Sequence, residues 1–310
     1  MPAHRVLAGV PEPVTVRVPA KINLALQIGP SRPDGYHELA TVFQAVSLYD
    51  EVTATPATGI SVRTVGDDSA EVPDDRTNLA YRAAQLLADE IDTVSGVGVS
   101  LEIAKGIPVA GGMAGGSADA AGALVACDAL WGTERDRTEL SRIASGLGSD
   151  VPFLLRGGTA LGTGRGEVLA DVLARGTYHW VIAVADGGLS TPEVYRAFDE
   201  LGAPTGPGPD AVLAALRSGD PVDLAHALTN DLQAAALALR PGLRRTLDAG
   251  REVGALASIV SGSGPTVVLL ARNQSHATTV AAELAGMGVC RTVRLAHGPV
   301  AGARIVDPTR

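Results

Sequence analysis

The 310-residue chain is poor in aromatic residues and cysteine, and each shortage excludes something. Aromatic side chains make up only 3%, so we expect a core built from Ala, Val, Leu and Ile. The two cysteines, Cys127 and Cys290, lie near no second cysteine or histidine cluster in the sequence. This excludes a disulfide framework and a structural zinc site, and it favours a reducing, cytoplasmic compartment.

The chain also lacks a long apolar run and a recognisable targeting segment. The apolar patch near its start is too short for a signal peptide, and it lacks the Arg and Ser content of a transit peptide. The longest uncharged stretch, residues 253–271, is interrupted by the sequence Ser261-Gly262-Ser263-Gly264-Pro265. We therefore expect a strand, a turn and a second strand there, rather than a membrane span.

Lysine is scarce: Lys21 and Lys105 are the only lysines among 25 cationic side chains. Either they mark positions that need a compact ammonium group, or their placement is chance. The net charge of −9 argues against nucleic-acid binding, which normally requires a basic face. With 46% hydrophobic and 19% charged residues, the chain has the composition of a globular protein of two domains or one large one.

Periodicity predicts a mixture of strands and helices. Apolar residues alternate from Ile22 to Ile28, which predicts a strand with Lys21 and Asn23 on its opposite face. Further strands are predicted at 39–55, 97–103, 151–155, 180–184, 255–260, 267–270 and 290–295. Helices are predicted at 77–91, 117–130, 133–147, 192–201, 210–216, 222–239, 243–253 and 275–287. A domain boundary is placed near residue 175.

The strongest local signal is the glycine-rich segment 108–120, PVAGGMAGGSADA, between a predicted strand and a predicted helix. Glycines let the backbone approach a ligand closely, and a helix N-terminus offers unpaired N–H groups to phosphate. The segment is not a P-loop, because Ser117 stands where that motif has lysine, and the pattern GxGxxG occurs nowhere in the chain. We predict phosphate binding; the alternative is a flexible turn packed on a sheet. Lys105, just upstream, either reaches the bound nucleotide or ends its strand in solvent.

Phosphoryl transfer to a hydroxyl also needs a group that orients or deprotonates the hydroxyl and a cation that neutralises charge. Asp150, at a predicted turn into an apolar strand, is the candidate for the first role, and Lys21 for the second. A capping carboxylate and a solvated strand lysine are the alternatives. Asn23 either bonds the substrate or fixes Lys21. Tyr36 and His37 follow a Pro-Asp-Gly turn and suit contact with a ring, unless they are ordinary surface residues.

Together these motifs resemble the superfamily of galactokinase, homoserine kinase, mevalonate kinase and phosphomevalonate kinase. That superfamily has a glycine-rich loop in its first domain and a late glycine-rich motif, which here is SGSGPT at 261–266. The segments PAKINL (19–24), RPDGYH (32–37) and GSDVPF (148–153) resemble, in order and spacing, the branch whose acceptor is 4-diphosphocytidyl-2-C-methyl-D-erythritol. The resemblance extends from about residue 14 to about residue 305.

The resemblance implies an α+β fold of two domains with the active site between them. Residues 1–175 would form a domain like domain 2 of ribosomal protein S5, and residues 176–310 a ferredoxin-like domain. Its function would be direct transfer of phosphate from ATP, with Mg²⁺, to the 2-hydroxyl of the acceptor in the non-mevalonate isoprenoid pathway. The partners would be small molecules, with no nucleic acid or membrane, and the protein a monomer or homodimer.

The resemblance also assigns roles residue by residue. Asp150 would be the catalytic base or hydroxyl orienter and Lys21 its cationic partner, while Asn23, Tyr36 and His37 would line the substrate site. Tyr195 matches a position where the family has an aromatic residue that stacks on cytosine. The Ser117 hydroxyl would contact phosphate or metal. The predicted ATP-binding residues are Lys105, Pro108, Val109, Ala110, Gly111, Gly112, Met113, Ala114, Gly115, Gly116, Ser117 and Ala118.

Two other functions remain open at this point. One is another small-alcohol kinase such as homoserine kinase, against which the sequence Asp34-Gly35-Tyr36-His37 argues. The other is a nucleotide-binding module without catalysis. The joint presence of Lys21, Asp150 and Ser117 argues against such a module, because binding alone needs no buried base.

Overall fold

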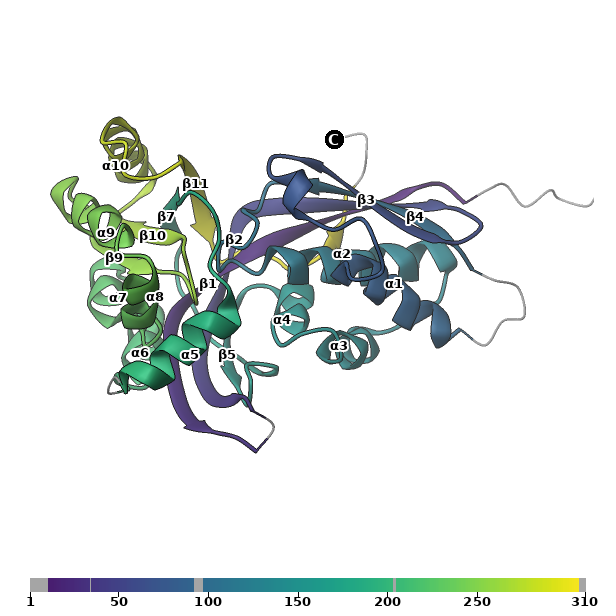
Figure 1. The fold of residues 1–310 in the computed structure, drawn as a ribbon, viewed down its shortest axis with the longest axis horizontal. Coiled ribbons are helices and arrows are strands. Elements are labelled where there is room, and N and C mark those ends of the chain that lie inside the picture. The colour runs from purple at the N-terminus through teal and green to yellow at the C-terminus, as the bar shows by residue number, and fades with distance from the viewer. Residues whose placement is uncertain (1–10, 34, 92–96, 203–204, 307–310) are drawn as a thin grey trace, which may run out of the picture.

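The structure is a computed structural model, and it describes residues 11–33, 35–91, 97–202 and 205–306. It contains an eight-stranded sheet and a four-stranded sheet, which occupy different ends of the elongated molecule (Figure 1). Two sequence-based predictions lie outside the described residues. One concerns residues 1–10, where no signal peptide is expected, and the other concerns Asp34 in the predicted turn.

The first sheet is built on two long antiparallel strands, β1 (Val14–Ser31) and β2 (His37–Pro56), in the order β12-β1-β2-β4-β3. Helix α2 (Gly115–Trp131) packs across both strands at Gly122, where a Cβ would lie 2.7 Å from a methyl of Val52. Only glycine permits this close approach. The other elements of this half are β3 (Ile60–Gly66), η1 (Ser69–Glu71), α1 (Leu79–Asp89), β4 (Val99–Lys105), α3 (Arg137–Ser145), α4 (Val151–Arg156), β5 (Thr159–Thr163) and β6 (Val168–Asp171).

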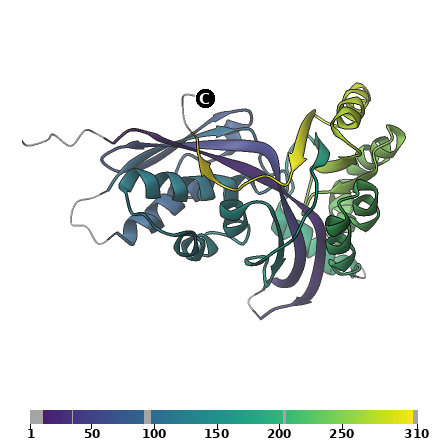
Figure 2. The same cartoon turned by 180° about the vertical axis from the view of Figure 1, so that it is seen from behind.

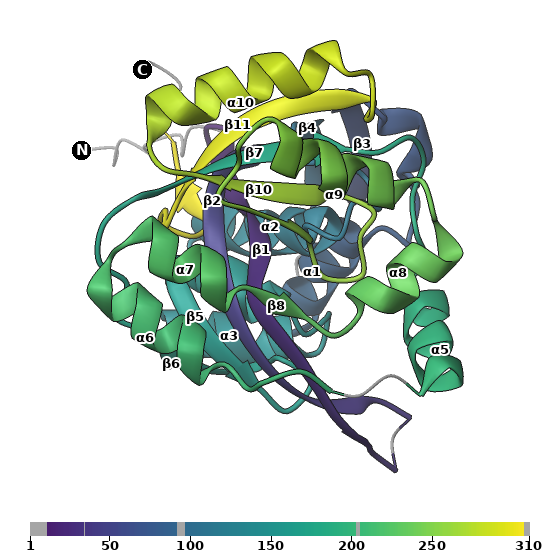
Figure 3. The ribbon, with the colours of Figure 1, turned by 90° about the vertical axis from the view of Figure 1, so that its left-hand side faces the viewer.

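The second sheet has the strand order β11-β7-β10-β9, and each neighbouring pair is antiparallel. Its strands are β7 (Tyr178–Val184), β9 (Ala257–Val260), β10 (Val267–Ala271) and β11 (Thr292–Gly298). Helices α9 (Leu243–Glu252) and α10 (Gln274–Gly286) cover its outer face (Figure 3). Counted along the chain, this is the βαββαβ arrangement of a ferredoxin-like domain, so the predicted two-domain α+β fold is confirmed. Helices α5 (Thr191–Leu201), α6 (Asp210–Ser218), α7 (Pro221–Ala227) and α8 (Gln233–Leu239) complete this half.

The two halves share strand pairing. Strand β8 (Thr229–Asn230) runs parallel to β1, with Ala25 opposite Thr229. Near the end of the chain, β12 (Arg304–Ile305) pairs with the start of β1, and Figure 2 shows this segment returning from the second sheet to the first. Both pairings carry residues from beyond position 175 into the first sheet. The boundary at 175 therefore stays a prediction.

Two sequence-based expectations are wrong. Residues 151–155, expected as a strand, form the short helix α4, which starts with Pro152 in its first turn. Its first five residues are all buried, and a short apolar run without periodicity fits a buried helix as well as a strand. The single helix expected at 222–239 is broken into α7, β8 and α8. Pairing of β8 with β1 overrides the local helix propensity there.

The core is mainly aliphatic, as the composition predicts. Its fully buried large side chains are mostly Ile and Leu, with Trp180, Tyr178 and Phe153 as the aromatic members. Within the described part of the chain, no helix is both long and apolar enough to cross a membrane. The cellular compartment stays a prediction.

Candidate active site

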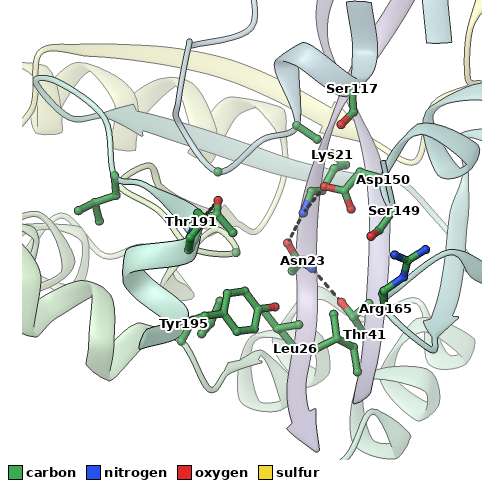
Figure 4. Close-up of a pocket in the computed structure, with 18 of the residues that line it drawn as sticks. Lys21, Asn23, Leu26, Thr41, Ser117, Ser149, Asp150, Arg165, Thr191 and Tyr195 are labelled. Carbon is green, nitrogen blue, oxygen red and sulfur yellow. Dashed lines mark hydrogen bonds and ion pairs between the residues drawn. The ribbon is translucent and has the colours of Figure 1, made fainter. Parts of the chain in front are cut away.

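A cavity of about 880 Å³ opens where the two halves of the molecule meet (Figure 4). Its walls come from β1, β2, the glycine-rich segment, the start of α4, helix α5 and the turn after β9. It therefore collects segments more than 200 residues apart in the sequence. Six predicted catalytic or substrate-binding residues line it: Lys21, Asn23, Tyr36, His37, Asp150 and Tyr195.

The glycine-rich segment forms one wall of this cavity. Helix α2 begins at Gly115, two residues earlier than predicted, after Ala114 in the left-handed conformation with φ 61°. No side chain caps this end of the helix, so its first N–H groups and the positive end of its dipole remain available to a ligand. Ala110, Gly111, Gly112, Ala114, Gly115, Gly116 and Ser117 line the cavity. This geometry suits the oxygens of a phosphate chain.

The turn at 261–266 holds the glycine-rich segment in place. The Ser261 hydroxyl donates to the Gly112 carbonyl at 3.2 Å, and the Thr266 N–H donates to the Gly111 carbonyl at 3.3 Å. A Cβ on Gly112, whose φ is +75°, would lie 2.3 Å from the Ser261 carbonyl oxygen. Glycine is required at 112 for both reasons. From the other side, the Lys21 N–H donates to the Met113 carbonyl at 3.1 Å, which ties the segment to β1.

Four predicted ATP-binding residues of this segment do not line the cavity: Pro108, Val109, Met113 and Ala118. Met113 and Ala118 are fully buried and belong to the core. Val109 instead faces a small second hollow beside Arg291. The Met113 and Ala118 side chains therefore support the loop from the core.

Lys105 is also absent from the cavity, contrary to the sequence-based expectation. Its Nζ bonds Asp50 Oδ2 at 2.5 Å and Asp119 Oδ2 at 2.8 Å, and its side chain is 2% exposed. Asp50 Oδ1 accepts the N–H groups of Gly106 and Ile107, which fixes the carboxylate at the end of β4. The lysine lies behind the glycine-rich segment, where these two carboxylates neutralise its charge.

The protonation of this buried cluster follows from its surroundings. Burial lowers the pKa of Lys105, but the charges of Asp119 and Asp50 outweigh burial and raise it above its ordinary value. Burial, followed by the Asp50 charge, raises the pKa of Asp119 well above its usual range. The lysine therefore stays charged, and Asp119 keeps its proton to a higher pH than an ordinary aspartate does.

Lys21 and Asp150, in contrast, meet inside the cavity, as the sequence suggests. Their Nζ and Oδ2 atoms are 3.4 Å apart, and the Asp150 side chain is 29% exposed. Asp150 occupies the N-cap position of α4 but makes no side-chain capping bond, so its carboxylate is free to face a substrate. This is the arrangement expected of a general base with a cationic neighbour.

A chain of hydrogen bonds fixes the position of Lys21 (Figure 4). Lys21 Nζ donates to Asn23 Oδ1 at 2.8 Å, and Asn23 Nδ2 donates to Thr41 Oγ1 at 2.8 Å. Thr41 in turn donates to the Ala25 carbonyl at 2.7 Å, and the Phe43 ring lies 5.1 Å from Nζ. Asn23 thus orients Lys21, one of the two roles proposed for it.

Aromatic side chains form the opposite end of the cavity. The rings of His37 and Tyr195 stack with centroids 5.7 Å apart, and His37 Nε2 lies 3.2 Å from Asp199 Oδ1. Burial, followed by the charge of Asp150, raises the pKa of Tyr195, so its phenol stays protonated. Tyr36 is 54% exposed, and the Arg165 guanidinium lies 5.2 Å from its ring centroid. These rings suit a planar base.

Several cavity residues have no counterpart in the sequence-based prediction. They are polar or charged side chains on loops, strand β2 and helix α5: Thr41, Ser149, Arg165, Thr191, Arg196, Asp199 and Ser263. Glycines flank Arg165 in the sequence, but this pattern indicates only a turn. Ser149 and Ser263 lie within the segments GSDVPF and SGSGPT, and the remaining residues carry no local motif because only the fold places them in the cavity.

Known protein families and solved structures resemble this chain. The family model of the GHMP kinases N terminal domain matches residues 78–158, and that of the GHMP kinases C terminal domain matches residues 212–290. A homoserine kinase from Cytophaga hutchinsonii has the same fold, with a TM-score of 0.75 at 17% identity over 99% of both chains. Fold and site thus define a small-molecule kinase of the GHMP class.

Similar sequences narrow the class. A 4-diphosphocytidyl-2-C-methyl-D-erythritol kinase from Nocardia farcinica is 57% identical, over 97% of this chain and 99% of its own. One from Streptomyces coelicolor is 59% identical, over 95% of this chain and 99% of its own. The crystal structure of a 4-(cytidine 5'-diphospho)-2C-methyl-D-erythritol kinase matches with a TM-score of 0.73 and 34% identity, over 91% of this chain and 98% of that one. The chain belongs to the 4-diphosphocytidyl-2-C-methyl-D-erythritol kinase family.

Proposed function

We propose that the protein transfers the γ-phosphoryl group of ATP to the 2-hydroxyl of 4-diphosphocytidyl-2-C-methyl-D-erythritol, in the non-mevalonate isoprenoid pathway. The observation that carries the proposal is the meeting of three features in one cavity: an uncapped, glycine-rich helix N-terminus, the Lys21–Asp150 pair, and a wall of aromatic rings. They match ATP, the reacting hydroxyl and the cytosine base of the acceptor, in that order.

In the proposed reaction the acceptor hydroxyl attacks the γ-phosphorus directly. A bond forms between the 2-oxygen and phosphorus, the bond to the β,γ-bridging oxygen breaks, and ADP leaves; no phosphoenzyme forms. Asp150 accepts the hydrogen bond of the hydroxyl and is the proposed acceptor of its proton. Lys21, held by Asn23, stabilises the negative charge that develops on the transferred group.

The remaining predicted residues bind the two substrates. The backbone of residues 110–117 would hold the phosphates of ATP at the start of α2. Tyr195, Tyr36 and His37 would hold the cytosine by stacking and hydrogen bonding. A kinase specific for a small alcohol such as homoserine has no need of this aromatic wall.

Mg²⁺ is proposed to accompany ATP, and the residues present fit it. The described part of the chain contains no group of three or more His, Cys, Asp or Glu side chains that could hold a metal ion. Mg²⁺ bound to a nucleotide takes most of its ligands from phosphate and water, so the Ser117 hydroxyl is a sufficient protein contact. When bound, the ion neutralises charge on the phosphate oxygens.

ADP release in a coupled assay tests the function, with the cytidyl acceptor, homoserine and mevalonate compared at equal concentration. Turnover with the cytidyl acceptor alone is the expected result. Turnover with homoserine or mevalonate would be consistent with the proposed phosphate-binding wall, but it would contradict the proposed cytosine site. ATP binding without turnover of any acceptor would favour the non-catalytic module. The oligomeric state, monomer or homodimer, and the cytoplasmic location stay predictions.

A further inference from the structure

The proposed acceptor carries a diphosphate, and an acidic protein must provide cations for it locally. Among the described residues that line the cavity, the lysines and arginines are Lys21, Arg165 and Arg196. Lys21 is already engaged by Asn23 and Asp150 at the reacting centre. One of the two arginines must therefore meet the diphosphate, if that group is bound by a side-chain cation.

Arg165 is held in position by the turn that carries it. This turn, between β5 and β6, is fastened to the start of β2: the Gly164 N–H donates to Glu38 Oε1 at 3.1 Å, and the Gly164 carbonyl accepts the Leu39 N–H at 2.8 Å. The Arg165 N–H donates to Glu167 Oε2 at 2.7 Å. The start of β2 also carries His37, so the turn is fixed relative to the aromatic wall.

The Arg165 side chain is also held in place, by contacts of its Nε and of the face of its guanidinium group. Its Nε lies 3.6 Å from Glu167 Oε1, its guanidinium carbon lies 5.2 Å from the Tyr36 ring centroid, and the side chain is 34% exposed. Within the described part of the chain, its two terminal Nη groups make no hydrogen bond or ion pair. A planar fork of this kind binds two phosphate oxygens at once.

Arg196 offers none of this support. It is exposed on α5, and no hydrogen bond or ion pair holds it among the residues that the structure describes. Fixing its long side chain on a ligand would cost conformational entropy that Arg165 has already lost on folding.

The position of Arg165 fits the path of the diphosphate. Figure 4 shows Arg165 on the same side of the cavity as Ser149 and Asp150, with Tyr195 on the other side. A diphosphate that joins a base at the aromatic wall to an alcohol at Asp150 must cross this space. We propose that Arg165 is a specificity-determining residue that binds the diphosphate of the acceptor; this inference rests on the proposed function.

Kinetics of Arg165→Ala test the proposal. The KM for the cytidyl acceptor is expected to rise about 10- to 100-fold, the effect of losing a charge-assisted contact. The KM for ATP and the kcat at saturating acceptor are expected to stay within about threefold, since the contact involves a part of the acceptor that does not react. Arg165→Lys keeps the charge without the fork, and it should give an intermediate KM.

Calorimetry with cytidine diphosphate and cytidine measures the difference in affinity between the two ligands. A purely structural role of Arg165 would leave this difference unchanged. The wild type should bind the diphosphate more tightly, and Arg165→Ala should remove most of that difference while leaving cytidine affinity unchanged. Arg196→Ala is the matched control, because it removes the same charge from the same cavity; a smaller effect on both measurements is expected.

Three results would overturn the inference alone: an unchanged acceptor KM in Arg165→Ala, an equal rise in both KM values, or an equal loss in Arg196→Ala. A wild type that phosphorylates homoserine or mevalonate but not the cytidyl acceptor would overturn the proposed function, and the inference with it. The wild-type acceptor comparison separates the two failures.

Discussion

The chain has two lysines, and the structure gives them opposite surroundings. Lys105 is 2% exposed and bonds two carboxylates that are themselves 0% and 3% exposed. Lys21 is 8% exposed and faces one carboxylate, Asp150, which is 29% exposed and 3.4 Å away. Both are buried, so burial does not distinguish them. The difference is that the partner of Lys21 remains open to a substrate.

The different surroundings of Lys105 and Lys21 imply different roles. In the Lys105 cluster the lysine charge is neutralised by two buried carboxyl groups, and Nζ lies 3.2 Å from where a Cβ on Gly115 would be, at the start of α2. The cluster therefore supports the proposed phosphate-binding wall from behind. In the Lys21 cluster the hydrogen bonds fix the lysine, while Asp150 keeps lone pairs for a hydroxyl. The first arrangement stabilises, and the second is available for catalysis.

The largest effect is expected for Asp150→Asn. The amide cannot take up a proton, so kcat should fall about 1,000- to 10,000-fold, while the affinity for ATP stays within about twofold. Coupled ADP release measures the first quantity and calorimetry the second. Asp199→Asn, which changes a carboxylate beside His37 in the same cavity, is the control and should reduce kcat far less. Near-normal turnover in Asp150→Asn would show that Asp150 is not the base.

Lys105→Met comes next, and its effect should be on folding. Removal of the cation leaves Asp50 and Asp119 buried without a cationic partner, which costs about 3–5 kcal/mol of the free energy of unfolding. Urea unfolding followed by circular dichroism measures it. Adding Asp119→Asn should restore part of the loss, because it removes one of the two buried ionisable carboxyl groups. A stability equal to wild type would contradict the structural role.

Lys21→Met should show the reverse pattern. Loss of the cation beside the transferred group should lower kcat about 100- to 1,000-fold. The free energy of unfolding should fall by less than in Lys105→Met, since Asp150 can still reach water. The same two assays on both lysine variants give a direct comparison. Equal losses of stability would remove the distinction between the two sites.

The smallest effect concerns pH. Because the pKa of Asp119 is raised in the folded protein above its ordinary value, the unfolded carboxyl ionises first as pH rises, which favours unfolding. The wild type should therefore lose stability relative to Asp119→Asn from about pH 4 upward, by at most about 1.4 kcal/mol per pH unit. Urea unfolding between pH 4 and 8 measures the difference, with the exposed Asp74→Asn as control. Parallel curves would contradict the raised pKa.

Local sequence determined much of this protein. The alternation from Ile22 to Ile28 places Lys21 and Asn23 together on one face of β1, because the side-chain period of a strand is two. The glycine-rich segment specifies an open helix N-terminus, because glycine and the missing cap act within a few residues. The motifs around Lys21, Tyr36 and Asp150 were sufficient to indicate the kinase family, and all three residues line the cavity.

Only the tertiary structure decided the rest. The sequence offers Lys105 and Lys21 as equal candidates, and long-range packing of Asp50 and Asp119 removes Lys105 from the cavity. The pairing of β8 with β1 breaks a predicted helix, and residue 165 acquires its neighbours from the start of β2. These contacts join residues 14 to 204 positions apart. Sequence periodicity sets the face on which a side chain lies, but the path of the chain sets what it meets.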